Sequence, residues 1–185
     1  VKHKVYPLLV FLHGSGERGN DNALQLLDGG DLFLIADLRE QFPAVVIFPQ
    51  CPSKVAWSKL PFPLDTSAAY NRKLNTDTLT TPELLVKLLM DSLVKHKRID
   101  KKRIYLGGLS LGGFGTYDLL IHFPDYFAAA FPICGQANID LYMRTASHVP
   151  VWIFHGGKDN VVSPQPDRDL IRTLQTAGIK SAKYT

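Results

Sequence analysis

The sequence predicts an α/β fold built on a mostly parallel sheet with helices on both faces. Short apolar runs without alternation, such as residues 8–12 and 45–48, are typical of strands that are covered on both faces. Segments with apolar residues at helical spacing separate these runs, and strands that alternate with helices form parallel sheets with right-handed crossovers. The 185 residues, 45% of them apolar, are enough for one domain with a sizeable core.

Each expected element follows from its local sequence. We expect strands at residues 8–12, 45–48, 104–107, 128–133 and 151–154, and the start of another at Tyr184. We expect helices at residues 31–42, 82–97, 111–123 and 164–177, the last of them ended by Gly178. Thr81 is the expected N-cap of the second helix, and Pro82 is its first position. The five leucines between residues 84 and 93 are expected to form its apolar stripe.

Two segments lack a clear pattern and are expected to form the walls of a substrate pocket. Residues 50–80 have no clear period, and residues 138–147 are expected to form a loop. A loop as long as the first in a compact domain is usually functional, and we expect it to lie over the carboxyl edge of the sheet. No repeat, low-complexity tract or linker divides the chain, so we expect residues 1–185 to form a single domain.

The pattern Gly108-Leu109-Ser110-Leu111-Gly112 follows an expected strand and opens an expected helix. A serine on such a sharp turn has a strained backbone, and its neighbours two residues away on either side must be small. The turn raises the hydroxyl above the sheet, and the helix N-terminus faces any negative charge that forms there. We therefore predict that Ser110 is a nucleophile. The alternative is a structural glycine turn with an idle serine.

The loop after the first strand carries the sequence Leu-His-Gly-Ser-Gly. A serine hydrolase needs a second backbone N–H to hold the oxyanion, and the loop at this place supplies it. We assign the two oxyanion donors to the backbone amides of Ser15 and Leu111. His13 precedes the loop, and we expect it to brace the loop by hydrogen bonding. Glu17 and Arg18 could contact substrate, but we favour an ion pair between them that shapes the loop.

The pattern His155-Gly156-Gly157-Lys158-Asp159 ends the expected strand at residues 151–154. In a catalytic triad the acid lies downstream of such a strand, where its carboxylate orients an imidazole. Asp159 is the candidate acid, and the alternative is an ordinary turn aspartate. His155 is too close in sequence to be oriented by Asp159 from the opposite side, so we expect it to be structural.

Taken together, these three motifs resemble the α/β-hydrolase superfamily. The resemblance is to its bacterial carboxylesterase/phospholipase branch, near polyhydroxybutyrate depolymerases and feruloyl esterases, and the segment Phe-Pro-Asp-Tyr-Phe-Ala-Ala-Ala at residues 123–130 shares it. It implies a serine esterase for a small-molecule ester, with Ser110 as nucleophile, Asp159 as acid and no cofactor. Trp57 resembles a residue near the substrate pocket of such enzymes, although a packed surface tryptophan is an equal alternative.

The sequence departs from this family at the catalytic histidine. Such families place that residue after the acid, in a loop that follows one more strand. All six histidines precede Asp159, and the chain begins without a Met and stops near the start of a strand. We therefore expect the fold to be incomplete at both ends and the base to lie beyond Thr185. Without it only the oxyanion hole and binding remain, which are worth roughly 10³–10⁴-fold over water.

The composition of the chain limits the classes of binding partner that we expect. The net charge of +4 is mild, and we favour a solvated helix end over a nucleic-acid surface for the basic patch at residues 95–103. No apolar run is long enough to span a bilayer, and no cluster has metal-ligand spacing. Cys51 and Cys134 could form one bridge or none. The compartment stays open, with a secreted or periplasmic location slightly favoured, and the sequence does not indicate an oligomeric state.

The favoured hypothesis is a carboxylic-ester hydrolase that works through an acyl-enzyme. The alternative within enzymes is a serine peptidase of the prolyl-oligopeptidase type, which uses the same strand-turn-helix motif around its serine. The alternative outside enzymes is a hydrolase-fold protein that binds ligand without turnover.

Overall fold

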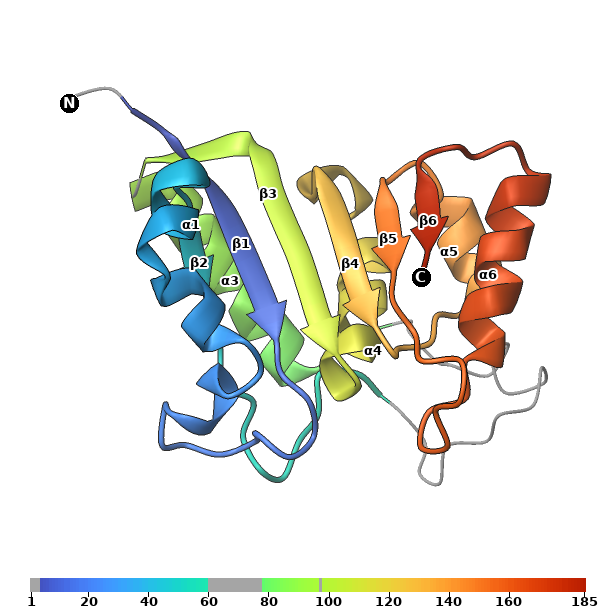
Figure 1. Cartoon of the computed structure of the whole chain (residues 1–185), viewed down its shortest axis with the longest axis horizontal. Coiled ribbons are helices and arrows are strands. Elements are labelled where there is room, and N and C mark those ends of the chain that lie inside the picture. The colour runs from blue at the N-terminus through green and yellow to red at the C-terminus, as the bar shows by residue number, and fades with distance from the viewer. Residues whose placement is uncertain (1–3, 60–77, 97) are drawn as a thin grey trace.

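The computed structural model describes residues 4–59, 78–96 and 98–185 of the chain. Its centre is a six-stranded sheet in the order β2-β1-β3-β4-β5-β6, and every neighbouring pair of strands is parallel. Figure 1 shows the strands side by side with their carboxyl ends at one edge of the sheet. The prediction of a parallel α/β fold is therefore confirmed.

Each predicted strand is present in the sheet. The strands are β1 (Tyr6–Leu12), β2 (Val45–Ile47), β3 (Ile99–Leu109), β4 (Ala129–Ile133), β5 (Val151–Ile153) and β6 (Ala182–Tyr184). Only β3 is much longer than predicted. Its pairing with β1 shifts register after Tyr6, and residues 101–103 are exposed and basic. Hydrophobicity alone therefore missed the first part of this strand.

Helices connect the strands, and one helix prediction and one loop prediction need correction. The α-helices are α1 (Ala36–Gln41), α3 (Thr81–His96), α4 (Leu111–His122), α5 (Ile139–Thr145) and α6 (Gln165–Thr176), and the 3-10 helices are η1 (Leu24–Leu26), η2 (Gly30–Leu34) and η3 (Pro124–Tyr126). The expected helix at residues 31–42 is divided between η2 and α1, because Ile35 is extended with ψ 120°. The expected loop at residues 138–147 contains α5, which begins where the Asn138 side chain accepts a hydrogen bond from the Leu141 amide at 3.0 Å.

The two faces of the sheet are covered unequally. Helices α3, α4, α5 and α6 lie on one face, whereas the segment of η2 and α1 covers part of the other (Figure 1). Within the layer formed by α3 to α6, a buried hydrogen bond between Tyr117 and Asp167 links α4 to α6. Among the described residues, no helix is both long and apolar enough to cross a membrane.

The apolar stripe predicted for α3 is wrong in its orientation. Leu84, Leu85, Leu88 and Leu89 are 41–58% exposed. The helix instead buries the row that contains Val86 and Met90. Apolar residues occupy both rows of this helix, so spacing alone could not show which row faces the sheet.

The N-terminus of α3 also differs from the prediction, because its cap is Thr80 and not Thr81. The Thr80 hydroxyl accepts a hydrogen bond from the Glu83 amide at 3.3 Å, and the Thr80 amide donates to the Glu83 carboxylate at 2.7 Å. This reciprocal pair is a capping box. A glutamate lies three residues after Thr80 but not after Thr81, and that spacing decides between the two threonines.

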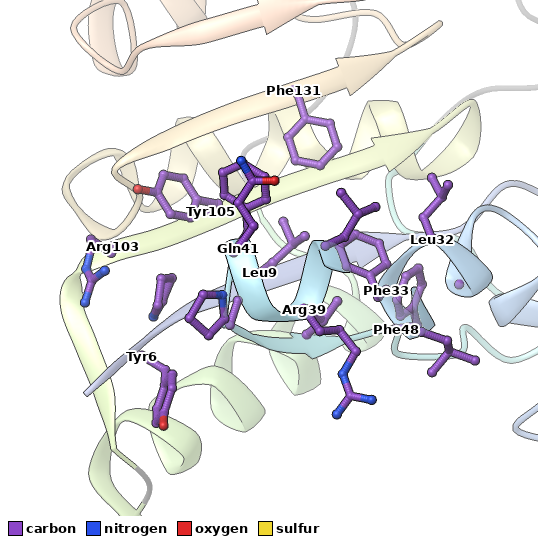
Figure 2. Close-up of a pocket in the computed structure, with 18 of the residues that line it drawn as sticks. Tyr6, Leu9, Leu32, Phe33, Arg39, Gln41, Phe48, Arg103, Tyr105 and Phe131 are labelled. Carbon is purple, nitrogen blue, oxygen red and sulfur yellow. The ribbon is translucent and has the colours of Figure 1, made fainter. Parts of the chain in front are cut away.

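The less covered face carries an apolar groove with a volume of about 1360 Å³. It lies between the η2–α1 segment and side chains of the sheet, and Figure 2 shows Leu9, Tyr105 and Phe131 from the strands opposite Phe33 from η2. Trp152 of β5 also lines it and is 46% exposed. The groove lies on the sheet face opposite the helices α3 to α6.

We expect Thr80→Ala to lower the free energy of unfolding by about 0.5–2 kcal/mol, because it removes the helix cap. Thr81→Ala is the matched control, since Thr81 is exposed and makes no cap contact. Its effect should stay within about 0.5 kcal/mol. Urea unfolding of both variants measures the difference. Equal losses, or a larger loss for Thr81→Ala, would contradict the assignment of the cap.

Candidate active site

The candidate site lies where the direction of strand order reverses. The chain leaves β1 for β2 on one side and returns through α3 to β3 on the other side of β1. In open α/β sheets, ligands bind outside the carboxyl ends of the strands at such a switch point. The loop after β1 and the turn after β3 therefore flank the crevice in which this fold type binds its ligands.

Ser110 lies in the turn between β3 and α4 with a strained backbone. Its φ of 53° is in the left-handed region, which non-glycine residues seldom adopt. Its amide donates to the Ile133 carbonyl at the end of β4 at 2.8 Å, and its side chain is partly exposed. The nucleophile role stays a prediction, but the backbone has the conformation that this role requires.

Two glycines permit the tight turn. A methyl group on Gly108 would lie 2.3 Å from the Gly112 carbonyl oxygen, and one on Gly112 would lie 1.9 Å from the Leu12 carbonyl oxygen. The first contact closes the turn on itself. The second contact shows that the start of α4 packs directly against the end of β1. In the same region, a methyl group on Gly14 would be 3.8 Å from Cβ of Ser110. The loop after β1 and the predicted nucleophile are therefore adjacent.

The two predicted oxyanion donors have no recorded acceptor among the described residues. Leu111 is the first residue of α4, so its amide has no partner within the helix. Ser15 is exposed, and its amide also lacks a recorded acceptor. The neighbouring Gly14 amide is occupied, because it donates to the Asp28 carboxylate at 3.2 Å. The assignment to Ser15 and Leu111 stays a prediction that this hydrogen-bond pattern supports.

The ion pair favoured between Glu17 and Arg18 does not form among the described contacts. Arg18 shapes the loop in another way, by donating to the carbonyls of Ser15 at 2.9 Å and Val55 at 3.2 Å. Burial, followed by the charge of Asp28 and a hydrogen bond to it, raises the pKa of Glu17. The guanidinium therefore binds two backbone carbonyls, and the Glu17 carboxyl group is hydrogen-bonded to that of Asp28.

His13 braces the loop after β1 by hydrogen bonding, as expected. Its Nε2 accepts the Cys51 amide at 2.9 Å, so Nδ1 carries the proton and donates to the Gly14 carbonyl at 2.6 Å. Burial lowers the pKa of His13, which keeps the ring neutral. Trp57 is 1% exposed and donates from Nε1 to the His13 carbonyl at 3.0 Å. The tryptophan is therefore not on the surface but packs beneath the loop, and its place near a substrate pocket stays a prediction.

Asp159 lies in the loop after β5, with one carboxylate oxygen held and the other less engaged. Oδ1 accepts the amides of Val161 at 2.9 Å and Val162 at 3.0 Å. The hydrogen bonds from the amides of Val162 and Val161 lower the pKa of Asp159 below its ordinary value. Oδ2 lies 3.7 Å from Nε2 of His155. The ionised carboxylate can therefore orient an imidazole, although its role as the catalytic acid stays a prediction.

Among the described residues, no histidine ring is hydrogen-bonded to Ser110. His13 and His155 are buried with both ring nitrogens engaged, and His122 binds the Asp118 carbonyl. His148 is an exposed partner of Asp125, and His3 lies outside the described residues. No group of three or more possible metal ligands occurs in the part of the chain that the structure describes.

Three residues near the site were missed by sequence reasoning. Asp28 lies in an irregular loop, 14 residues from the Gly14 amide that it binds. Cys134 follows β4 with a φ of 42°, and its thiol is within hydrogen-bond reach of the Ser110 backbone. Asp167 is buried in α6 and contacts His155. A charged residue on the buried face of a predicted helix was the available signal for Asp167, whereas no signal existed for the other two.

Both cysteines are free thiols, so no bridge joins Cys51 to Cys134.

The apolar groove of Figure 2 is separate from the candidate site, since none of the predicted site residues lines it. We place the site by the backbone geometry at the switch point and not by the size of that groove, because the chemistry requires the strained serine and the unbound amides.

Comparison with known proteins places the chain among esterase-like folds. A solved structure described as a thermostable esterase superposes on 98% of this chain with a TM-score of 0.84 and 37% sequence identity. The chain has the α/β-hydrolase fold. It spans 46% of that esterase, so the two proteins share one structural unit and not their whole length.

Curated sequences agree with this assignment. The chain is 34% identical over 90 residues to the bifunctional acetylxylan esterase/xylanase XynS20E of Neocallimastix patriciarum, a match that covers 49% of this chain and 13% of that protein. It is 40% identical over 52 residues to poly(3-hydroxyalkanoate) depolymerase C of Paucimonas lemoignei, which covers 28% of this chain and 13% of that protein. Residues 86–152 match the prolyl oligopeptidase family.

We expect Gly112→Ala to be destabilising, because its methyl group would lie 1.9 Å from the Leu12 carbonyl oxygen and neither backbone can withdraw easily. The expected loss in the free energy of unfolding is about 1–3 kcal/mol or more. Gly16→Ala is the matched control, since no atom lies within 4 Å of its added carbon. Chemical denaturation compares the two variants. A Gly112→Ala protein as stable as Gly16→Ala would show that α4 does not press on β1.

The lowered pKa of Asp159 makes stability depend on pH in a defined direction. Its ionised carboxylate stabilises the fold above the ordinary pKa of 3.8, and this contribution is lost as the pH falls through the folded-state value. Asp159→Asn should therefore be less stable than the wild-type protein at pH 7, with a gap that closes under acid. Urea unfolding at a series of pH values measures the gap. A constant gap would mean that the charge of Asp159 has no role in the loop.

Proposed function

We propose that this domain cleaves carboxylic esters through an acyl-enzyme, with Ser110 as the nucleophile. The observation that carries the proposal is the left-handed backbone of Ser110, with φ 53°, at the switch point of the sheet. The exposed Ser15 amide in the adjoining loop supports it, because an acyl-transfer site needs donors beside the nucleophile. The esterase and depolymerase names of the similar proteins point to the same reaction class.

In this proposal each group has a role in the reaction. The Ser110 oxygen attacks the acyl carbon, and the carbonyl oxygen that becomes negative is stabilised by the amides of Ser15 and Leu111. The Leu111 amide is at the N-terminus of α4, where the helix dipole also favours negative charge. Loss of the alcohol leaves an acyl-enzyme, which water then hydrolyses to release the acid and restore the serine hydroxyl.

Asp159 acts in this scheme through a histidine. Its Oδ1 is fixed by two backbone amides, so the direction of Oδ2 is defined. A carboxylate held in this way orients the imidazole that accepts the serine proton and stabilises the imidazolium that forms. We propose that this histidine lies outside the described residues, because His13, His122 and His155 bind other groups and no described histidine is hydrogen-bonded to Ser110.

The peptidase alternative rests on the match of residues 86–152 to the prolyl oligopeptidase family. The matched range includes the serine turn, which both reaction classes use, but it ends before the loop that carries Asp159. The match therefore supports the nucleophile without selecting amides over esters. The 37% identity over nearly the whole chain with an esterase favours the ester.

We expect a serine-directed fluorophosphonate to label Ser110 in the natural protein that contains this domain, and p-nitrophenyl acetate to be hydrolysed faster than a dipeptide amide. Ser110→Ala should abolish labelling and lower kcat by on the order of 10³-fold or more. Ser181→Ala is the control, since that serine is exposed at the start of β6. Peptide mapping and kinetics measure both effects. Faster cleavage of the amide would favour the peptidase, and no labelling of a folded protein would favour a binding protein without turnover.

A further inference from the structure

A buried polar network joins three elements behind the candidate site. The hydroxyl of Tyr117 in α4 donates to Oδ1 of Asp167 in α6 at 2.7 Å, and Oδ2 of the same carboxyl group lies 2.7 Å from Nδ1 of His155. The side chains of Asp167 and His155 are fully buried, and Tyr117 is 0% exposed. Buried groups of this kind are costly unless they are fully hydrogen-bonded, and these three satisfy one another.

The network ends on the loop that carries Asp159. His155 follows Phe154, which comes directly after β5 and pairs with Ile133 of β4. The Nε2 atom of His155 donates to the Val162 carbonyl at 2.9 Å. The ring therefore spans the loop from its first residue to its last. The amide of Val162 in turn donates to Oδ1 of Asp159 at 3.0 Å. Val162 therefore accepts a hydrogen bond from His155 through its carbonyl and donates one to the Asp159 carboxylate through its amide.

The protons on the ring of His155 strengthen its hydrogen bonds to Asp167 and Val162. The Val162 carbonyl only accepts, so Nε2 of His155 carries a proton, and one further proton lies between Nδ1 and Oδ2 of Asp167. Burial disfavours a charged ring, but the hydrogen bonds to Asp167 and Val162 outweigh it and raise the pKa of His155. Hydrogen bonds that involve charged groups are roughly twice as strong as neutral ones.

We propose that Tyr117, Asp167 and His155 are positioning residues that hold the loop at residues 155–162 and so fix the direction of the Asp159 carboxylate. The consequence for turnover rests on the function proposed above, whereas the hold on the loop does not. None of the three touches substrate in this scheme. Their effect is on the orientation of the acid, and a displacement of about 1 Å in such a group can cost up to about 10²-fold in rate.

A neighbouring tyrosine provides a matched control. Tyr142 of α5 is also 0% exposed, and its ring meets that of Tyr117 edge to face with centroids 5.8 Å apart. Its hydroxyl has no hydrogen-bond partner among the described residues. Tyr117→Phe and Tyr142→Phe therefore remove the same atom from the same part of the core, but only the first removes a hydrogen bond to Asp167.

The test compares these two variants in the natural protein by amide hydrogen exchange and by steady-state kinetics with p-nitrophenyl acetate. Tyr117→Phe should speed exchange at Val161 and Val162 and lower kcat by about tenfold, with KM changed less than about twofold. Tyr142→Phe should change neither. If Asp167→Asn folds, it should have a larger effect than Tyr117→Phe on both amide exchange and kcat. If it does not fold, Tyr117→Phe alone decides the matter.

The two measurements separate the two proposals. Unchanged exchange in Tyr117→Phe, or equal effects of the two tyrosine variants, would overturn the positioning role. Faster exchange with an unchanged kcat would also overturn it, because the loop would then not govern the acid. In a wild-type protein without esterase activity, faster exchange in Tyr117→Phe alone would still support the hold on the loop, and only the proposed function would fail.

Discussion

The contact between Gly112 and the end of β1 is the constraint on which the rest of the site depends. The start of α4 lies so close to the Leu12 carbonyl that no side chain fits between them. This approach brings the turn at Ser110 beside the loop after β1, although about 95 residues separate the two in sequence. The proposed acyl transfer needs both segments at once, since one would supply the nucleophile and the other a donor for the developing charge.

Helix α4 is also the element through which the surrounding loops are fixed. Its consecutive residues Tyr117 and Asp118 reach opposite neighbours, because successive helical positions point about 100° apart. Tyr117 binds Asp167 of α6, and Asp118 accepts a hydrogen bond from the Ser58 hydroxyl at 2.5 Å. Burial raises the pKa of Asp118 to about 7 and that of the nearby Glu83 to about 8. The helix that follows the serine thus connects the segment that contains Ser58 with α6, which contacts the loop that carries Asp159.

The sequence predicted the sheet and the order of the motifs because these depend on local patterns. Uniform apolar runs identified the strands, and the glycines at 108 and 112 identified the turn before any contact was known. The orientation of α3 was not predictable in this way, because its leucines and the row of Val86 and Met90 are equally apolar. Asp28 and Cys134 were missed for a different reason. Their relation to the site arises from the meeting of distant loops, which no spacing records.

The position of Cys134 affects how chemical modification of this protein should be interpreted. Its thiol lies beside the Ser110 backbone, and burial raises its pKa, so the reactive thiolate is scarce at neutral pH. An alkylating reagent should therefore react slowly there, and the attached group would lie beside the backbone of Ser110. Inactivation by such a reagent would report obstruction of the crevice. It would not identify a sulfur nucleophile.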